Sequence, residues 1–275
     1  MFLLDLAPWL LATLFLVGAI AIGIIPFFLI RSRWRGETPQ DSRELGAQVA
    51  LRVSVLYSVI LGMVFAEVQS SFSDIKRTIH QETIELGTAF AHLELLDNRG
   101  ARDAQRGLVD YARRVVDTEW PLMGRKQPNV GVTALLAEIQ LMIAALPGDD
   151  VRSNTLRQGA LHGINEVARL HATRMLSSID EVPYLFWIVV VFGFGVIVAL
   201  FMVFKPTLLN LALVSAFCAM TGVVLFFIFV MSNPFLGPAK ISSEPFEFFI
   251  EGAESHIAAE GAQTEQRSAT PGPSN

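Results

Sequence analysis

The sequence is poor in cysteine and in charge, and both shortages exclude classes of protein. Cys218 is the only cysteine among 275 residues, so the chain itself can build neither a disulfide framework nor a cysteine-rich metal site. Charged residues make up 17% of the chain, which is below the value of about a quarter that is typical of soluble domains. The net charge of −5 provides no basic surface for phosphates, so we expect no nucleic-acid partner.

Patterns that indicate catalysis or metal binding are missing as well. The four histidines between residues 73 and 182 do not have the spacing of metal ligands, and we expect them at the surface or in the core: His80, His92, His162 and His171. No phosphate-binding loop, nucleophile elbow or kinase signature is present. We therefore expect no enzymatic activity, no catalytic residue, no bound metal and no cofactor.

The sequence does contain long apolar runs. Residues 10–30, 184–204 and 208–231 are uncharged, and each run is long enough to cross a hydrocarbon core of about 30 Å. The first run could instead be a signal peptide, but no Lys or Arg precedes it and arginines follow it. The last two runs are so close in sequence that they predict an antiparallel hairpin.

A further span is predicted at about residues 49–70. Its uncharged part is only about 14 residues long, a length that also occurs in buried core helices. We favour a span because apolar residues extend the pattern on both sides, and because Arg52 and Glu67 can reach opposite membrane surfaces.

Between this span and the third, charges return and apolar residues take helical spacing. The sequence predicts one continuous helix over about residues 46–97, with a length of about 75 Å at the standard rise. Further helices are expected at residues 102–120, ended by Pro121, and at 133–145 and 151–178. The expected fold class is thus all-α, with four transmembrane helices and an antiparallel helical extramembrane domain inserted between spans two and three.

These patterns divide the chain into five segments. Residues 1–72 hold the first two spans, 73–182 the helical domain, 183–231 the transmembrane hairpin, 232–252 a membrane-proximal segment and 253–275 a tail. The membrane-proximal segment is rich in proline and apolar residues and is too short to span. The tail is rich in Ala, Gly, Ser, Thr and Pro, so we expect it to be disordered.

The arginines predict an orientation. Arg31, Arg33, Arg35, Arg43 and Arg52 lie in or beside the short segment that joins spans one and two. Such segments are cytoplasmic by the positive-inside rule. We therefore expect the N-terminus and the helical domain outside the cytoplasm.

Three segments resemble the bestrophin-like domain family, whose members are multi-pass membrane proteins of bacteria and archaea. They are Val55-Leu56-Tyr57-Ser58-Val59-Ile60-Leu61-Gly62, the stretch from Asp110-Tyr111-Ala112 to Glu119-Trp120-Pro121, and Pro234-Phe235-Leu236-Gly237 followed by Ser243-Glu244-Pro245-Phe246. The resemblance covers nearly the whole chain except the tail. The family commonly has an acidic residue two places before that first proline, where this chain has Ser232.

This resemblance implies a distant relation to bestrophins, which are pentameric anion channels whose pore is lined by the second span. It implies a place in the bacterial or archaeal inner membrane, with the lipid bilayer, small anions and further copies of the chain as partners. Bestrophins keep their termini and helical domain in the cytoplasm, the reverse of what the arginines predict. Of these two orientations, we favour the one that the arginines predict.

One face of the second span suits an anion path. At 100° per residue it places small polar groups, aromatic rings and a cation in one row: Ser54, Ser58, Gly62, Phe65, Gln69, Phe72 and Lys76, together with Leu61. The same face could simply pack against another helix, because Ser58 and Gly62 are four residues apart. The sequence therefore supports two functions: an oligomeric channel for small anions, or a non-conducting sensor or interaction scaffold that uses its helical domain.

Overall fold

The computed structural model describes residues 7–33, 39–127, 130–179, 184–205 and 207–269. Every regular element in these ranges is a helix, which confirms the all-α class. The chain forms two compact units, one from residues 1–73 and 181–240 and the other from residues 74–180 and 241–275. We call them the apolar unit and the polar unit, and we describe each by itself.

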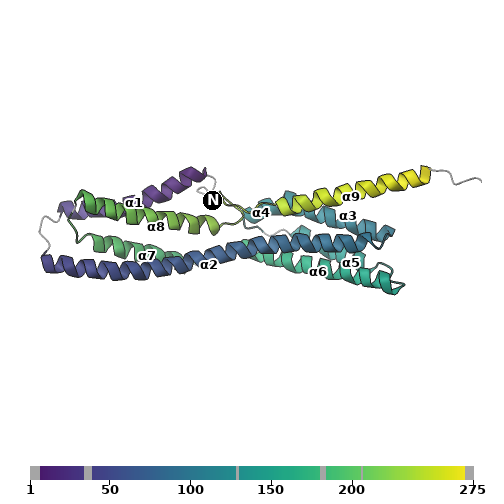
Figure 1. Cartoon of the computed structure of the whole chain (residues 1–275), viewed down its shortest axis with the longest axis horizontal. Coiled ribbons are helices and arrows are strands. Elements are labelled where there is room, and N and C mark those ends of the chain that lie inside the picture. Colours follow the sequence, from purple (N-terminus) through teal and green to yellow (C-terminus); the bar gives the residue numbers. More distant parts are fainter. Residues whose placement is uncertain (1–6, 34–38, 128–129, 180–183, 206, 270–275) are drawn as a thin grey trace, which may run out of the picture. The chain divides into compact units, whose positions relative to one another are not determined.

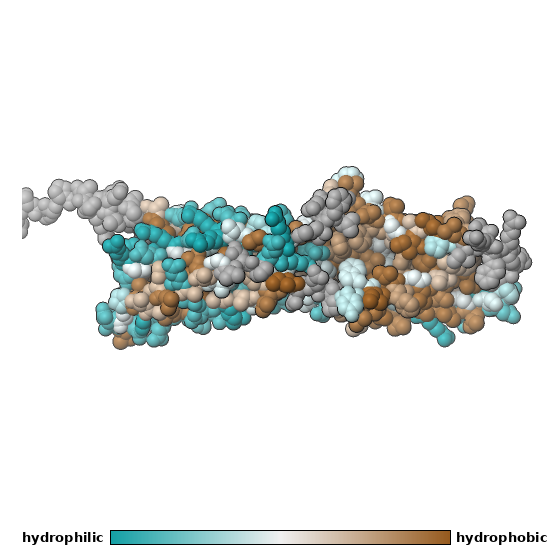
Figure 2. All heavy atoms as spheres, turned by 180° about the vertical axis from the view of Figure 1, so that it is seen from behind, coloured by the Kyte–Doolittle hydropathy of each residue, from teal (hydrophilic) through white to brown (hydrophobic). Residues whose placement is uncertain are grey.

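The apolar unit contains α1 (Pro8–Arg33), the first part of α2 (Gln40–Glu94), α7 (Tyr184–Phe201) and α8 (Leu208–Met231). Each of these four helices is long and apolar enough to cross a membrane. Figure 2 shows hydrophobic residues gathered over this unit and hydrophilic residues over much of the other. The helices coincide closely with the predicted spans, except that α7 ends three residues earlier than expected.

Close contacts between small residues hold α1 beside α8 (Figure 1). Gly222 lies so near α1 that a Cβ atom built on it would be 2.8 Å from the Ala19 Cβ and 2.8 Å from the backbone oxygen of Phe15. Gly193 on α7 makes similar room for the ring of Tyr57 on α2. Small residues of this kind let apolar helices approach closely and gain van der Waals contact.

Helix α2 confirms the prediction of a single long helix, since its 55 residues run without a break from Gln40 to Glu94. The polar unit packs the last part of this helix with α3 (Arg99–Arg114), η1 (Val115–Glu119), α4 (Trp120–Gly124), α5 (Val130–Ala144), α6 (Val151–Ile179) and α9 (Glu244–Ala269). Helix α3 packs against α5 and α9, and α5 packs against α6. Fully buried aliphatic side chains fill the space between them: Leu108, Ile139, Ile143, Ile164 and Val167.

The path from α3 to α4 differs from the expectation that Pro121 ends a helix. The chain stays helical through Gly124, because the segment η1 widens to π-helical hydrogen bonding before the proline. The backbone N–H of Trp120 donates to the oxygen of Val115, five residues earlier. Pro121 has no N–H to donate, so a proline at this position removes one helical hydrogen bond and favours such a local widening.

The C-terminal region also differs from the sequence-based expectation. Disorder is predicted from Ala253 onward, whereas α9 continues to Ala269. The side chain of Ala253 is buried, Glu254 pairs with Arg113 of α3, and His256 Nε2 lies 2.8 Å from Glu94 Oε1 of α2. The alanines and glutamates of this segment are good helix formers, which is consistent with α9. Composition does not reveal the ion pairs, because Arg113 and Glu94 are far from α9 in the sequence.

Candidate functional site

The predicted pore-lining residues lie along α2 and are turned away from the core of the apolar unit to different extents. Ser58, Gly62, Gln69 and Lys76 are exposed, whereas the other three are half-buried: Ser54, Phe65 and Phe72. Leu61, which was placed on the same face, is only 7% exposed and belongs to the core. The core-facing row of α2 consists of Tyr57, Leu61, Val64 and Val68.

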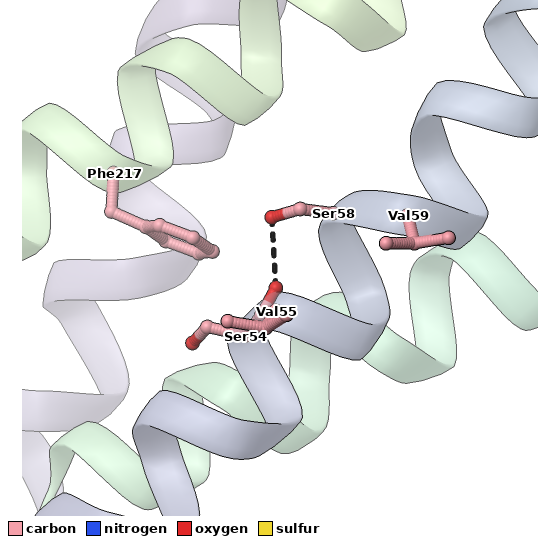
Figure 3. A pocket seen from close by; sticks show the side chains of 5 residues that line it. All are labelled: Ser54, Val55, Ser58, Val59 and Phe217. Atoms are coloured by element: carbon pink, nitrogen blue, oxygen red, sulfur yellow. Dashed lines mark hydrogen bonds between the residues drawn. The ribbon is translucent and has the colours of Figure 1, made fainter.

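Gly62 lies on this face of α2 and has open space beside it. A Cβ atom built on Gly62 would meet nothing within 4 Å, in contrast to those on Gly193 and Gly222. A shallow hollow lies one to two turns away along α2. It is lined by Ser54, Val55, Ser58 and Val59, together with Phe217 of α8 (Figure 3). The Ser58 hydroxyl donates to the backbone oxygen of Ser54 at 2.8 Å. Within a single chain, Gly62 therefore makes no close contact with another helix.

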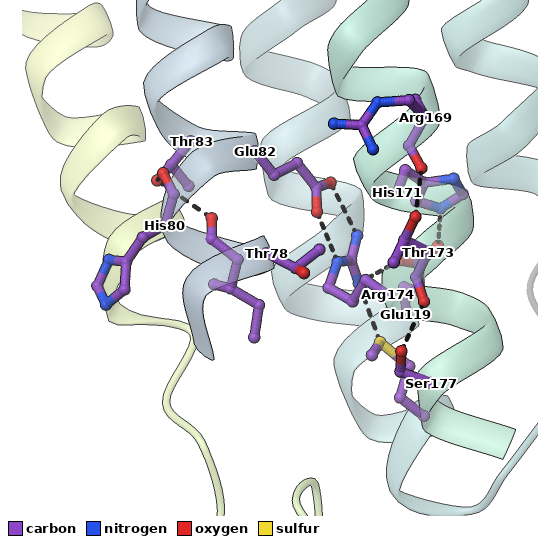
Figure 4. Close-up of polar contacts among 12 residues, drawn as sticks. Thr78, His80, Glu82, Thr83, Glu119, Arg169, His171, Thr173, Arg174 and Ser177 are labelled. Atoms are coloured by element: carbon purple, nitrogen blue, oxygen red, sulfur yellow. Dashed lines mark hydrogen bonds and ion pairs between the residues drawn. The ribbon is translucent and has the colours of Figure 1, made fainter. Parts of the chain in front are cut away.

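A second candidate site lies in the polar unit, where a charged cluster is fully buried. The guanidinium of Arg174 on α6 binds the carboxylate of Glu82 on α2 with two hydrogen bonds, from Nε at 2.8 Å and from Nη2 at 3.0 Å (Figure 4). Its Nη1 lies 2.6 Å from Glu119 Oε1 at the end of η1. All three side chains are 0% exposed. Bidentate pairing of this kind is the geometry that arginine and carboxylate prefer.

Two further residues complete what we call the Arg174 cluster. The Tyr111 hydroxyl on α3 donates to Glu82 Oε1 at 2.5 Å, and His171 Nε2 on α6 lies 2.9 Å from Glu119 Oε2. The cluster thus joins α2, α3, η1 and α6 through Glu82, Tyr111, Glu119, His171 and Arg174. Arg174 also contacts the sulfur of Met123 on α4 at 2.9 Å.

A short segment covers the Arg174 cluster on one side. Residues 241–246, which we call the lid, include the first three residues of α9 and contain the fully buried ring of Phe246. This ring lies 5.5 Å from the Arg174 guanidinium carbon, and the ring of Trp120 lies 5.6 Å from the same atom. The indole N–H of Trp120 donates to the backbone oxygen of Ile241 at 3.2 Å. Aromatic faces at these distances attract the cation and exclude water from it.

The surroundings set the charge of each group in the cluster. Burial alone would raise the pKa of Glu119, but the hydrogen bond with His171 and the charge of Arg174 lower it below its ordinary value. Burial and the neighbouring Glu82 carboxylate raise the pKa of Tyr111 well above its ordinary value, so this residue stays a neutral donor. Burial would lower the pKa of Arg174, but the two carboxylates raise it. Arg174 and Glu119 are therefore charged at neutral pH.

In the part of the chain that the structure describes, no group of three or more His, Cys, Asp or Glu side chains is arranged to hold a metal ion. The Arg174 cluster is closed to substrate because its polar side chains have almost no exposed surface. The cluster can hold the lid and four helical segments, namely α2, α3, η1 and α6, in one arrangement.

Comparison with family models gives one decisive match. The model of the bestrophin-like domain matches residues 17–246, which is most of the chain. The chain belongs to the bestrophin-like domain family. Searches of curated proteins and of solved structures give no match. The bestrophin-like assignment and the four apolar helices together make this a membrane protein.

Two of the three segments that carried the bestrophin-like resemblance meet at the Arg174 cluster. The stretch from Asp110 to Pro121 supplies Tyr111, Glu119 and Trp120, and the segment that ends in Phe246 supplies the lid. The third segment, residues 55–62, supplies the exposed small residues of α2. Segments that carry the family resemblance therefore contribute residues to both candidate sites.

The Arg174 cluster was not predicted from the sequence. A signal was nevertheless present in the helical spacing. Glu82 follows Ile75 and Ile79 and precedes Leu86 in the buried row of α2, and Arg174 continues the buried row of α6 after Val167 and His171. A charged residue within an apolar row is a sign of a buried, paired charge.

Proposed function

We propose that the protein is an oligomeric membrane channel for small anions in which several copies of α2 line the path. The observation that carries the proposal is the position of Ser58 and Gly62, which are exposed although they lie in the middle of an apolar helix. Hydroxyl groups can donate hydrogen bonds to an anion, and a glycine leaves room for it. In this proposal transport, not catalysis, is the activity, and nucleic acid is not a partner.

Further along α2, aromatic and cationic residues follow the small polar ones. Phe65 is half-buried and packs partly on the core, so its ring edge can border a path. Lys76 lies one turn beyond Phe72 on the same face. Rings from several subunits would form a dry constriction, and the repeated ammonium groups would raise the local anion concentration.

Chloride flux through reconstituted vesicles tests this proposal. We expect Lys76→Glu to reduce flux by about threefold or more at low ionic strength and by less at high salt, because salt screens the ring of charge. Phe65→Ala should raise flux by widening the constriction. Arg77→Glu makes the same charge change about 100° around the helix and should have a smaller effect.

A non-conducting protein gives a different pattern. If the α2 face only packs, Phe65→Ala lowers thermal stability by leaving a cavity, and Lys76→Glu is nearly silent. Wild-type vesicles with confirmed incorporation but no flux of chloride or other small anions contradict the channel. An oligomer without flux would instead favour the sensor or interaction scaffold.

We also propose that the polar unit faces away from the cytoplasm, on the basis of the arginines at the end of α1, in the connection to α2 and in the N-terminal part of α2. Cysteine substitutions at Gln127 and Glu44, both exposed, test this in a Cys218→Ala background with a membrane-impermeant thiol reagent on intact cells. We expect labelling at residue 127 and not at residue 44. The opposite pattern would place the polar unit in the cytoplasm, as in bestrophins.

A further inference from the structure

The outward face of α2 in the polar unit is apolar where the face of a solvated helix is ordinarily polar or charged. Seven exposed positions of α2 follow one another at alternating spacings of three and four residues: Asp74, Arg77, Gln81, Ile84, Thr88, Ala91 and Leu95. We call this row the α2 seam. Its last four residues carry no charge, and Ile84 and Leu95 are 63% and 57% exposed. Within the described part of one copy of the chain, the seam is therefore left uncovered.

The spacing of the seam determines what kind of surface fits it. Alternating steps of three and four residues average 3.5, the repeat at which two parallel helices stay in contact as they coil around each other. The α2 helix of a second copy has the same repeat. Copies that are inserted into a membrane in the same orientation also present this helix in parallel and at the same height. Ile84, Ala91 and Leu95 of the two copies would then meet in successive layers and be removed from water.

The polar residues of the seam are compatible with a contact between copies. The Thr88 hydroxyl donates to the backbone oxygen of Ile84 at 3.0 Å, so it needs no acceptor from a partner. Asp74 and Arg77 have opposite charges, and neither forms an ion pair with another described residue. Between parallel helices, Asp74 of one copy lies one layer from Arg77 of the next, so the seam is complementary to itself in charge.

The space beside the seam is open as well. A Cβ atom built on Gly87, which flanks the seam between Ile84 and Thr88, would meet nothing within 4 Å. A small residue at such a position lets a neighbouring helix approach without steric conflict. The flank of the seam therefore does not hinder a second copy of α2.

We propose that the α2 seam is an interface between copies of this chain, in which α2 helices pair in parallel through Ile84, Ala91 and Leu95. A second copy accounts for both the heptad spacing and the self-complementary charges, whereas a lipid surface requires neither. The interface rests on the oligomeric state within the proposed function and specifies the contact that supports it. It does not depend on anion conduction.

Disulfide cross-linking of the full-length protein in its native membrane tests the contact. Ala91→Cys in a Cys218→Ala background places one thiol in the seam, where it faces its own counterpart in a parallel pair. Ala172→Cys is the matched control, because Ala172 is an exposed alanine on α6 of the same unit. After mild oxidation, non-reducing electrophoresis should show several-fold more dimer for the cysteine at 91 than for the cysteine at 172.

Charged substitutions then show whether the apolar residues of the seam hold the copies together. Ile84→Glu with Leu95→Glu, added to the Ala91→Cys protein, sets like charges against each other across the seam and should remove the cross-link. Both residues are exposed in one copy, so the fold should persist, which thermal unfolding verifies. Leu141→Glu, at a 72% exposed leucine of α5, should leave the cross-link unchanged.

The outcomes separate the seam from the proposed channel. A cysteine at 91 that links no better than the one at 172 overturns the seam, as does a cross-link that survives the two glutamates. If the purified protein is nevertheless an oligomer that conducts chloride, only the seam fails. A cross-link that the glutamates remove, in a protein without chloride flux, supports the seam and contradicts the channel.

Discussion

Replacing Arg174 with methionine should lower the stability of the polar unit by about 3–5 kcal/mol, the cost of removing one partner from a buried ion pair. Methionine keeps much of the volume, so the loss comes from Glu82 and Glu119, which would remain buried without their counter-charge. Thermal unfolding of the detergent-purified protein, followed by circular dichroism, measures the change.

Arg169→Met is the matched control for this experiment. Arg169 lies on the same helix, but its side chain is 61% exposed and its partner Glu166 is three residues away. Exposed pairs of this kind contribute about 0–1 kcal/mol. Similar unfolding temperatures for the two variants would show that the buried pairing of Arg174 contributes little, and would contradict the central place that we give to this cluster.

The second large effect is expected in the apolar unit. Gly222→Leu should disrupt the packing of α8 against α1, since even a Cβ atom at this position collides with the Phe15 backbone oxygen. Overpacking costs about 1–3 kcal/mol and more where backbone must move, as it must here. We expect a lower yield of folded protein and a lower unfolding temperature in detergent.

Gly195→Leu provides the comparison for Gly222→Leu. Gly195 lies within α7, another apolar helix, and a Cβ atom there meets nothing within 4 Å. The same substitution should thus be tolerated within one copy of the chain. Equal loss of folded protein in both variants would mean that leucine harms these helices in general, and not that the contact between α1 and α8 is tight.

The fold was largely predictable because its strongest determinants are local. Apolar runs of spanning length and the unbroken apolar row of α2 are visible in any window of the sequence, and the structure has helices at these places. The Arg174 cluster could not be derived in this way. Glu82 and Arg174 are 92 residues apart, and only the packing of α2 against α6 makes them partners.

The contacts of the C-terminal helix α9 were also not predictable from the sequence, because they too join residues that are far apart in the chain. The composition of residues 253–275 suggests a solvated tail, whereas the apolar composition of residues 232–252 does not say which partner Phe246 contacts. Only the folded chain shows that Phe246 covers a cation on α6. The lid depends on a tertiary contact that local propensity does not encode. For the α2 face, the sequence identifies the row of residues, but a single chain does not define how copies of that row meet.

The segment η1 has a consequence for chain length in this region. A π-helical turn is what results when one residue is inserted into an α-helix and the surplus is kept as a bulge. Removing one residue here, such as the exposed Asp117, would let η1 relax to α-helix while the flanking turns keep their relative orientation. Removing one residue from the regular turns of α3 would instead rotate one flank by about 100° relative to the other. Related chains should therefore tolerate a single-residue deletion between Val115 and Glu119 better than one within α3.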